Sequence, residues 1–301
     1  MRKILLASTA LVAMTSVSAM ASDITISGSM NFIYSSDALD ENTDGLALGS
    51  ASDFDTETDV NINFTNTTDS GITTTLGVGF DETNSTDDMT ATISSDFGEI
   101  KIVSAGADDN YVVGFDEKYN KAGEGTDGEN FLLGGATGES IGYKLPTLVS
   151  GLTVALQHSN EDTTESFGYG ASYNAGVATV GYAFISSSSA TSVTTEYTSA
   201  NVSGTIAGIG YGIEKNERAA GTSIDEATSW GVSYALDGIT LAYESSKSET
   251  EAGDYDDYTQ IAVSYSIAPG MTAIITSSDV TATDAAATAV EELEAQLKLS
   301  F

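Results

Sequence analysis

The segment comprising residues 106–130 concentrates side chains that can attract cations. Two lysines, Lys118 and Lys121, stand among a larger number of carboxylates. The acidic residues that are candidates for this role are Asp108, Asp109, Asp116, Glu117, Glu124 and Asp127. Acidic side chains along an aqueous path favour cations over anions. The segment would therefore select cations if it lined such a path, and the alternative is an exposed acidic loop.

A second acidic segment imitates the start of a calcium-binding loop. Asp40, Asn42 and Asp44 offer oxygen ligands at alternate positions before Gly45, as calcium loops do. The glutamate that such a loop carries at its twelfth position is replaced here by Ala51. We therefore expect no required cofactor, and Ca²⁺ bound incidentally between neighbouring carboxylates is favoured over a dedicated site.

The sequence gives little indication of catalytic chemistry. The chain contains one histidine, His158, and no cysteine, which excludes thiol chemistry and cysteine-ligated metals. A catalytic base needs a positioned nucleophile or water and an orienting partner. No sequence pattern supplies these groups beside His158, so we expect no enzymatic activity.

The chain is strongly acidic, with 44 acidic residues, 10 basic residues and a formal net charge of −34 at pH 7. A charge of this sign makes nucleic acid a poor partner. Self-repulsion favours disorder when hydrophobicity is low, but 41% of this chain is hydrophobic. We therefore expect a well-formed structure with most of its acidic residues at the surface.

Residues 1–21 have the features of a secretory signal peptide. Two basic residues precede an apolar run, and Ala19 and Ala21 match the small-x-small pattern of the cleavage site. The apolar run is too short for a membrane-spanning helix, which needs about 20 residues. We expect cleavage after Ala21 and a single domain over residues 22–301.

Beyond the signal peptide, apolar and polar residues alternate with a period of two. No segment approaches the roughly 18 consecutive apolar residues of a membrane-spanning helix, whereas period-two alternation indicates two-faced strands. The alternation predicts sixteen strands, at residues 24–34, 60–65, 72–81, 88–95, 99–105, 139–146, 152–159, 166–174, 177–185, 193–202, 206–214, 227–236, 239–244, 258–267, 271–278 and 291–301.

The last predicted strand, residues 291–301, has a competing helical interpretation. Its residues have good helix propensity, and three alanines lie just upstream. A helix would leave Leu299 and Phe301 off its apolar face, whereas a strand places every apolar residue of the segment on one face. We therefore favour the strand.

The connections alternate between tight turns with Gly, Asn, Asp or Pro and longer, acidic segments. This layout is typical of a sixteen-stranded antiparallel transmembrane β-barrel with short periplasmic turns and long outer loops. Because lipid cannot satisfy an open sheet edge, the first and last strands must pair. The alternative is a secreted all-β sandwich or adhesin.

Three stretches carry a family resemblance. They are residues 24–28 (ITISG), residues 97–102 (FGEIKI), which lead into the longest loop, and residues 297–301 (LKLSF). In this order they resemble the Gram-negative general-diffusion porins. The resemblance implies a water-filled homotrimeric barrel, a third loop (residues 106–130) that folds inward and narrows the pore, and a terminal Phe301 that the barrel-assembly machinery recognises.

Strand parity predicts two faces for the barrel wall. The apolar face would contact lipid, with aromatic girdles at both interfaces. These are Phe32, Tyr34, Phe80, Phe184, Tyr211 and Tyr243 near the loop ends, and Tyr173, Tyr234, Tyr265 and Phe301 near the turn ends. The opposite face would line the pore, and the wall residues of interest are Asn31, Asn61, Asn63, Lys101, Lys144 and Lys298.

Few basic residues on the predicted barrel wall oppose the loop carboxylates. Porins of the kind that the chain resembles oppose these acids with an arginine cluster on the barrel wall. The early strands here carry no arginine, which leaves Lys101, Lys144 and Lys298 as the candidates. This departure favours cation selectivity.

The sequence thus predicts an outer-membrane channel of a Gram-negative bacterium for passive diffusion of ions and small hydrophilic solutes, with cation selectivity. The alternatives are a channel specific for a sugar or nucleoside and a structural or adhesive barrel. The expected partners are outer-membrane lipid, lipopolysaccharide, the barrel-assembly machinery and two further copies of the chain.

Overall fold

The computed structural model describes residues 22–39, 51–81, 89–104, 110–112, 115, 139–161, 164–189, 194–249, 255–282 and 290–301. The predicted signal peptide, the Asp40, Asn42 and Asp44 segment and the carboxylates predicted at residues 108, 109, 116, 117, 124 and 127 lie outside these residues. No helix in the described part of the chain is long and apolar enough to cross a membrane.

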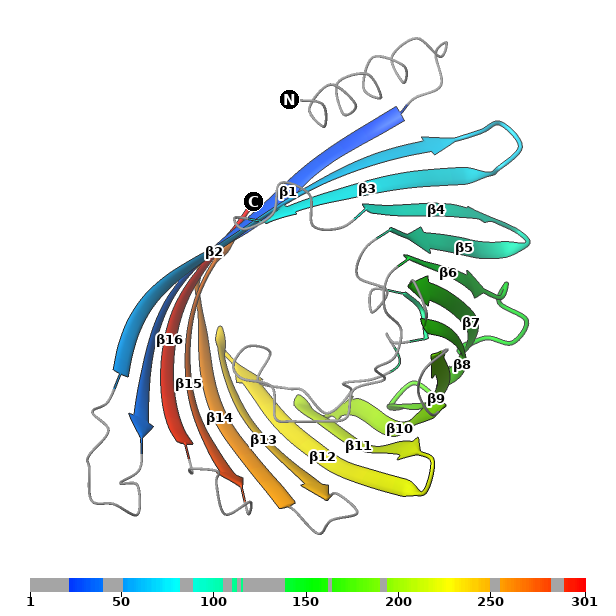
Figure 1. Cartoon of the computed structure of the whole chain (residues 1–301). Coiled ribbons are helices and arrows are strands. Elements are labelled where there is room, and N and C mark those ends of the chain that lie inside the picture. The colour runs from blue at the N-terminus through cyan, green and yellow to red at the C-terminus, as the bar shows by residue number, and fades with distance from the viewer. Residues whose placement is uncertain are drawn as a thin grey trace.

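Sixteen strands form one closed antiparallel barrel, as predicted, in which each strand pairs with its neighbours in sequence and β1 pairs with β16 (Figure 1). The strands are β1 (Ser22–Leu39), β2 (Ala51–Thr67), β3 (Thr73–Asp81), β4 (Met89–Ser95), β5 (Gly98–Val103), β6 (Glu139–Lys144), β7 (Leu152–Glu161), β8 (Thr164–Asn174), β9 (Ala178–Ser189), β10 (Thr195–Ile206), β11 (Ile209–Ala220), β12 (Ser223–Leu236), β13 (Ile239–Glu249), β14 (Tyr255–Ala268), β15 (Met271–Ala282) and β16 (Val290–Ser300).

The barrel closes where the two ends of the sheet meet. β16 pairs with β1 from Ser29 opposite Ser300 to Leu39 opposite Val290. Beyond the strand, the backbone N–H of Phe301 donates to the carbonyl of Gly28 at 3.0 Å, and the N–H of Gly28 donates back at 3.2 Å. These bonds confirm the strand predicted for the final segment, and its helical interpretation is wrong.

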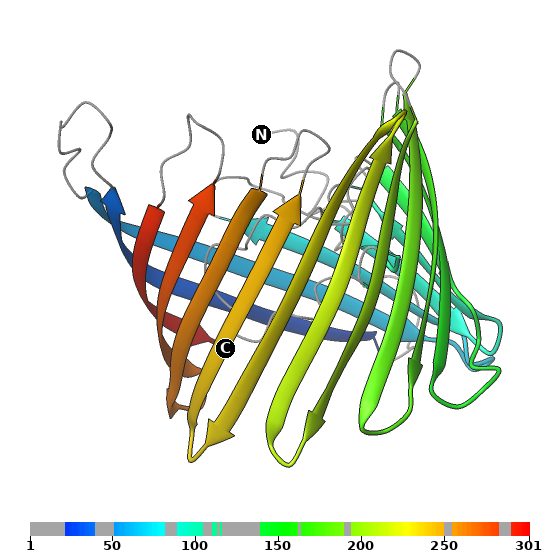
Figure 2. The same ribbon diagram turned by 90° about the horizontal axis from the view of Figure 1, so that it is seen from below.

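Several strands extend beyond the predicted boundaries. β2 begins at Ala51, nine residues before the predicted start at residue 60. β11 and β12 likewise continue through residues 215–226, which were expected to form a loop, and only a two-residue turn connects them. These extensions carry polar residues on both faces, so apolar alternation does not reveal them. Figure 2 shows the tilted strands from the side, with short turns at one end of the barrel.

Two of the tight turns require left-handed backbone conformations. Asp237 and Gly238, which connect β12 and β13, have φ values of 51° and 83°, as the two central residues of a type I′ hairpin turn do. Ala207 and Gly208 form the equivalent turn between β10 and β11. The predicted strands at residues 193–202 and 206–214 left residues 203–205 for this connection, whereas the turn lies at Ala207 and Gly208.

The two faces of the wall have the polarity of a membrane barrel rather than of a soluble protein. Many large apolar side chains are exposed on the outward face, among them Ile26, Tyr169 and Leu241. Many of the buried side chains are polar, and Glu214 and Ser229 are each only 1% exposed. The inversion is expected where lipid surrounds the barrel and water fills it.

Candidate functional site

The inward face of the wall is identified by the segment of residues 110–112, which lies inside the ring of strands (Figure 1). The ring of Tyr111 there contacts Lys101 and Lys144. Directly paired residues of antiparallel strands share a face, so the strand register carries this assignment around the barrel. On this face the register places Asn31, Asn61, Asn63, Lys101, Lys144 and Lys298.

Three hydrogen bonds fix the described part of the long loop to the inward wall. The side-chain amide of Asn110 donates to Ser140 Oγ of β6 at 2.8 Å. The backbone N–H of Val112 donates to Gln157 Oε1 of β7 at 3.1 Å. Further round the barrel, β10 contributes Asn201, whose Nδ2 donates to the carbonyl of Phe115 at 2.6 Å. These bonds hold the beginning of the loop inside the barrel.

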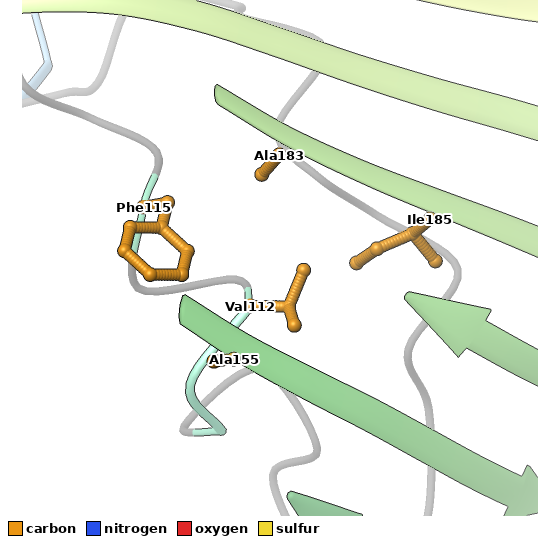
Figure 3. Packing of buried hydrophobic residues seen from close by; sticks show 5 residues of the cluster. All are labelled: Val112, Phe115, Ala155, Ala183 and Ile185. Carbon is orange, nitrogen blue, oxygen red and sulfur yellow. The ribbon is translucent and has the colours of Figure 1, made fainter. Parts of the chain in front are cut away.

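Apolar contacts complete this attachment. Val112 and Phe115 pack with Ala155, Ala183 and Ile185 of the wall in a buried cluster (Figure 3). The cluster buries apolar side chains of the loop against the wall, and burial of this kind stabilises the docked loop. Sequence reasoning missed it, although Ala183 and Ile185 occupy positions of inward parity where polar residues are the rule.

Two glycines of β8 make room for the loop. A Cβ atom added to Gly168 would lie 2.8 Å from Ile185 Cγ1 and 3.2 Å from Val112 Cγ1. One added to Gly170 would overlap the ring of Phe115. The loop therefore sits against the backbone of β8 at a depth that larger residues would not permit.

Tyr111 is held by a small charged cluster at the base of the loop. Its hydroxyl donates to Glu99, which also accepts a 2.6 Å bond from Lys144 Nζ. The Nζ atoms of Lys144 and Lys101 lie 5.0 and 5.7 Å from the centroid of the Tyr111 ring, within the range of cation–π attraction. Burial, followed by the hydrogen bond to Glu99, raises the pKa of Tyr111, so its phenol remains a donor.

Acidic side chains dominate the inward face among the described residues. Asp55, Glu57 and Asp59 follow one another at alternate positions of β2, and Figure 1 shows β16, β1 and β2 across the barrel from β6 to β9. By register and strand parity, the inward acidic residues are Asp23, Asp55, Glu57, Asp59, Glu99, Glu214, Asp225, Glu244, Glu292 and Glu294, and the inward basic residues are Lys101, Lys144, Arg218 and Lys298.

The arginine among these basic residues corrects the list of candidates drawn from the sequence. Arg218 lies on β11, in a stretch that was expected to be a loop. Its Nε and Nη2 atoms donate to Asp225 Oδ2 of β12 at 3.0 and 2.5 Å. The wall therefore has an arginine in addition to the three lysines, and its charge is matched by an adjacent carboxylate.

Two residues named in the sequence analysis, His158 and Tyr211, do not lie on the lumen wall. His158 lies on the outward face, paired with Ile141 and Phe167, and its Nε2 is 3.7 Å from Glu165. Tyr211, predicted near the loop end, lies at the turn end, where its hydroxyl donates to the carbonyl of Val177 at 3.0 Å. Within the described residues, no group of three His, Cys, Asp or Glu side chains could hold a metal ion.

Comparison with known proteins identifies a family that this chain matches. A family model described as Gram-negative porin matches residues 7–285. A porin structure refined at 1.8 Å resolution is 17% identical, with a TM-score of 0.66, and covers 93% of this chain and 100% of its own. A search of curated proteins finds no significant relative.

Two other solved structures show the same fold and come from different bacteria. The anion-selective porin from Comamonas acidovorans is 11% identical, with a TM-score of 0.72 over 93% of this chain and 100% of its own. The trimer form of OmpT, an outer membrane protein of Vibrio cholerae, is 13% identical, with a TM-score of 0.67 over the same shares. At these identities the likeness shows the fold alone.

Proposed function

The chain belongs to the Gram-negative porin family, and on that premise we propose that its barrel is a cation-selective channel for ions and small hydrophilic solutes. The family and the closed sixteen-stranded barrel make it a diffusion channel of the bacterial outer membrane. The acidic inward wall is the observation that supports the finer claim of cation selectivity.

The balance of charge along the lumen favours cations. Lys144 and Arg218 are each paired with a carboxylate, Glu99 and Asp225 respectively, which offsets their charge. The carboxylates of β2 and β16 add negative charge on the other side of the lumen. Negative charge on a water-filled wall concentrates cations and depletes anions within about a Debye length, roughly 10 Å at 0.1 M salt.

Fold alone does not determine selectivity in this family of structures. The Comamonas acidovorans porin shares the fold and is described as anion-selective, so the side chains of the wall must decide the sign. If the carboxylates predicted at residues 108, 109, 116, 117, 124 and 127 also face the lumen, they would strengthen the same preference.

The reversal potential of purified channels in a planar bilayer tests this proposal. With a potassium chloride gradient across the membrane, a cation-selective pore shifts the zero-current potential toward the equilibrium potential of potassium. The shift should shrink at high ionic strength because salt screens the wall charges. A zero-current potential on the chloride side would refute the proposal.

We also propose that the channel is a homotrimer, like the trimer form of OmpT from Vibrio cholerae. The outward faces of β1 to β5 support this proposal, because their described side chains include no charged residue. By contrast, β11 to β14 carry the outward ion pairs Lys215–Glu226 and Lys247–Asp257. Chemical cross-linking in intact outer membranes should give three linked copies, and a barrel that remains monomeric would contradict the proposal.

We further propose that Phe301 has a role in barrel assembly. The Phe301 side chain is 76% exposed while its backbone closes the barrel against Gly28. The side chain is thus available to the assembly machinery without being required for strand pairing. Signal-peptide cleavage after Ala21 and contacts with lipopolysaccharide are further proposals for this outer-membrane protein.

A further inference from the structure

The first strand of the barrel extends past its pairing with the last. β1 pairs with β2 from Ser22 onward, whereas its pairing with β16 begins only at Ser29. One further pair of backbone bonds joins Gly28 to Phe301. Among the described residues, no strand therefore pairs with residues 22–27 on the edge of β1 that faces away from β2, and Figure 1 shows β1 running on beside β2 beyond the end of β16.

The backbone groups on this open edge follow from the last bonded pair. Gly28 both donates to and accepts from Phe301, so its N–H and C=O point away from β2. In an antiparallel ladder the residues that point to one side recur every two positions. The N–H and C=O groups of Ile26 and Ile24 therefore also point to the open edge, where no described strand bonds them. They repeat at a spacing of roughly 7 Å, because each residue advances a strand by about 3.4 Å.

The open edge lacks three features that commonly protect exposed strand edges, which are lysine, proline and a β-bulge. Residues 24–27 read ITIS, and their pairing with β2 shows no register shift. Isoleucine and threonine are also residues that favour extended strands. The segment is therefore straight, regular and able to accept another strand.

The two faces of this segment define the side chains that an added strand would carry. Ile24 and Ile26 lie on the outward face and are 55% and 59% exposed, so the residues paired with them would be apolar. Asp23 and Thr25 lie on the opposite, inward face, where a basic residue suits Asp23 and a polar residue suits Thr25. The matching strand therefore alternates apolar and polar residues and carries a positive charge opposite Asp23.

We propose that the open edge of β1 at residues 23–27 binds an extended segment of a periplasmic polypeptide by β-strand addition. The edge lies toward the turn end of the barrel, because Ser22 pairs with Asn66 just before the turn between β2 and β3, and the short turns of such barrels face the periplasm. A polypeptide backbone supplies donors and acceptors at the spacing of the ladder, whereas lipid does not. The added segment runs antiparallel to β1 and continues the line of β16.

A labelled synthetic peptide, Thr-Val-Thr-Val-Lys-Thr, tests the proposal. Its residues in order would take the positions opposite residues 27 to 22, and fluorescence anisotropy measures its Kd for purified channels in lipid nanodiscs, which leave both ends of the barrel open. N-methylation of the first valine removes the N–H that would bond the carbonyl of Ile26 and should raise Kd about tenfold. N-methylation of the central threonine is the matched control. Its N–H points away from β1, so Kd should not change.

Ile24→Pro applies the same test to the channel. Proline removes the N–H on the open edge and leaves the bonds to β2 in place, so Kd should again rise about tenfold, whereas Ile24→Val keeps the donor and should bind as the wild type does. A wild-type potassium chloride current shows that each variant is folded, and the reversal potential tests the proposed function separately.

Three results would overturn the strand-addition site. They are no peptide binding to folded channels, an equal Kd for the two N-methylated peptides, and peptide binding only after the copies of the channel dissociate. The third result would assign the open edge to a contact between copies. Binding that weakens with N-methylvaline and with Ile24→Pro, but not with their controls, supports the proposal.

Discussion

The amide of Asn201 on β10 donates a 2.6 Å hydrogen bond to the backbone carbonyl of Phe115, which lies 86 residues earlier in the chain. This bond joins the third loop to the barrel wall well beyond the strand from which the loop departs. Together with the bonds to Ser140 and Gln157, it fixes the loop at three strands. The width of the pore therefore depends on contacts between loop and wall.

Replacement of Asn201 by leucine should loosen the loop. The carbonyl of Phe115 would lose its donor while remaining buried, at a cost of about 1–3 kcal/mol. We expect a larger and noisier single-channel current, because the undocked loop obstructs the lumen less. Asn160→Leu at the loop end of β7 is the control. Currents equal to those of the wild type in Asn201→Leu would show that this bond does not hold the constriction.

Replacement of Gly170 by alanine should also displace the loop, because it crowds the place where Phe115 packs against β8. The added methyl group would overlap the Phe115 ring, and overpacking of this kind costs about 1–3 kcal/mol. Single-channel conductance should rise in Gly170→Ala and return toward the wild-type value in the double variant Gly170→Ala with Phe115→Leu, whose smaller side chain restores the space. Failure of the second change to rescue the first would contradict the packing explanation.

The raised pKa of Tyr111 makes a prediction about alkaline conditions. Its hydrogen bond to Glu99 requires the protonated phenol, so the bond is fully present below pH 10, the ordinary pKa of tyrosine. The bond is lost only as pH rises above that value toward the raised pKa of the folded channel. The tyrosinate absorbance of the wild type minus that of Tyr111→Phe should therefore show no titration below pH 10. A midpoint at or below pH 10 would be inconsistent with the buried, acceptor-bound phenol.

Phe301 offers a test of assembly that leaves the strand pairing intact. Phe301→Ala keeps the backbone bonds to Gly28 but removes the exposed ring, so we expect less folded barrel in the outer membrane. Phe301→Tyr retains an aromatic ring and is the matched control. The folded fraction can be measured as the protease-resistant barrel in isolated outer membranes, and equal fractions in both variants would argue against recognition of the terminal aromatic.

The membrane-embedded parts of the fold could be predicted because lipid and water impose opposite polarity on alternate residues. This rule located all sixteen strands, including the weakly patterned β10. It failed at the loop ends, where both faces of a strand contact water. Within β2, carboxylates alternate with Phe54 and threonines, and this period of two was the signal that could have extended the strand to Ala51.

The candidate site was predictable only in part. Strand parity assigned Lys101 and Lys298 to the inward face because each lies in a clearly alternating segment. It could not find Arg218, whose strand continues through a polar stretch, or the pairing of Asn201 with Phe115. That contact joins residues distant in sequence, and no local pattern in either segment encodes it.

The reversal potential of single channels in a potassium chloride gradient tests the central claim most directly. Wild-type channels should show a zero-current potential on the potassium side, and the triple variant Asp55→Asn, Glu57→Gln, Asp59→Asn should shift it toward zero because the wall loses three negative charges. A wild-type potential on the chloride side would contradict the account of the acidic wall.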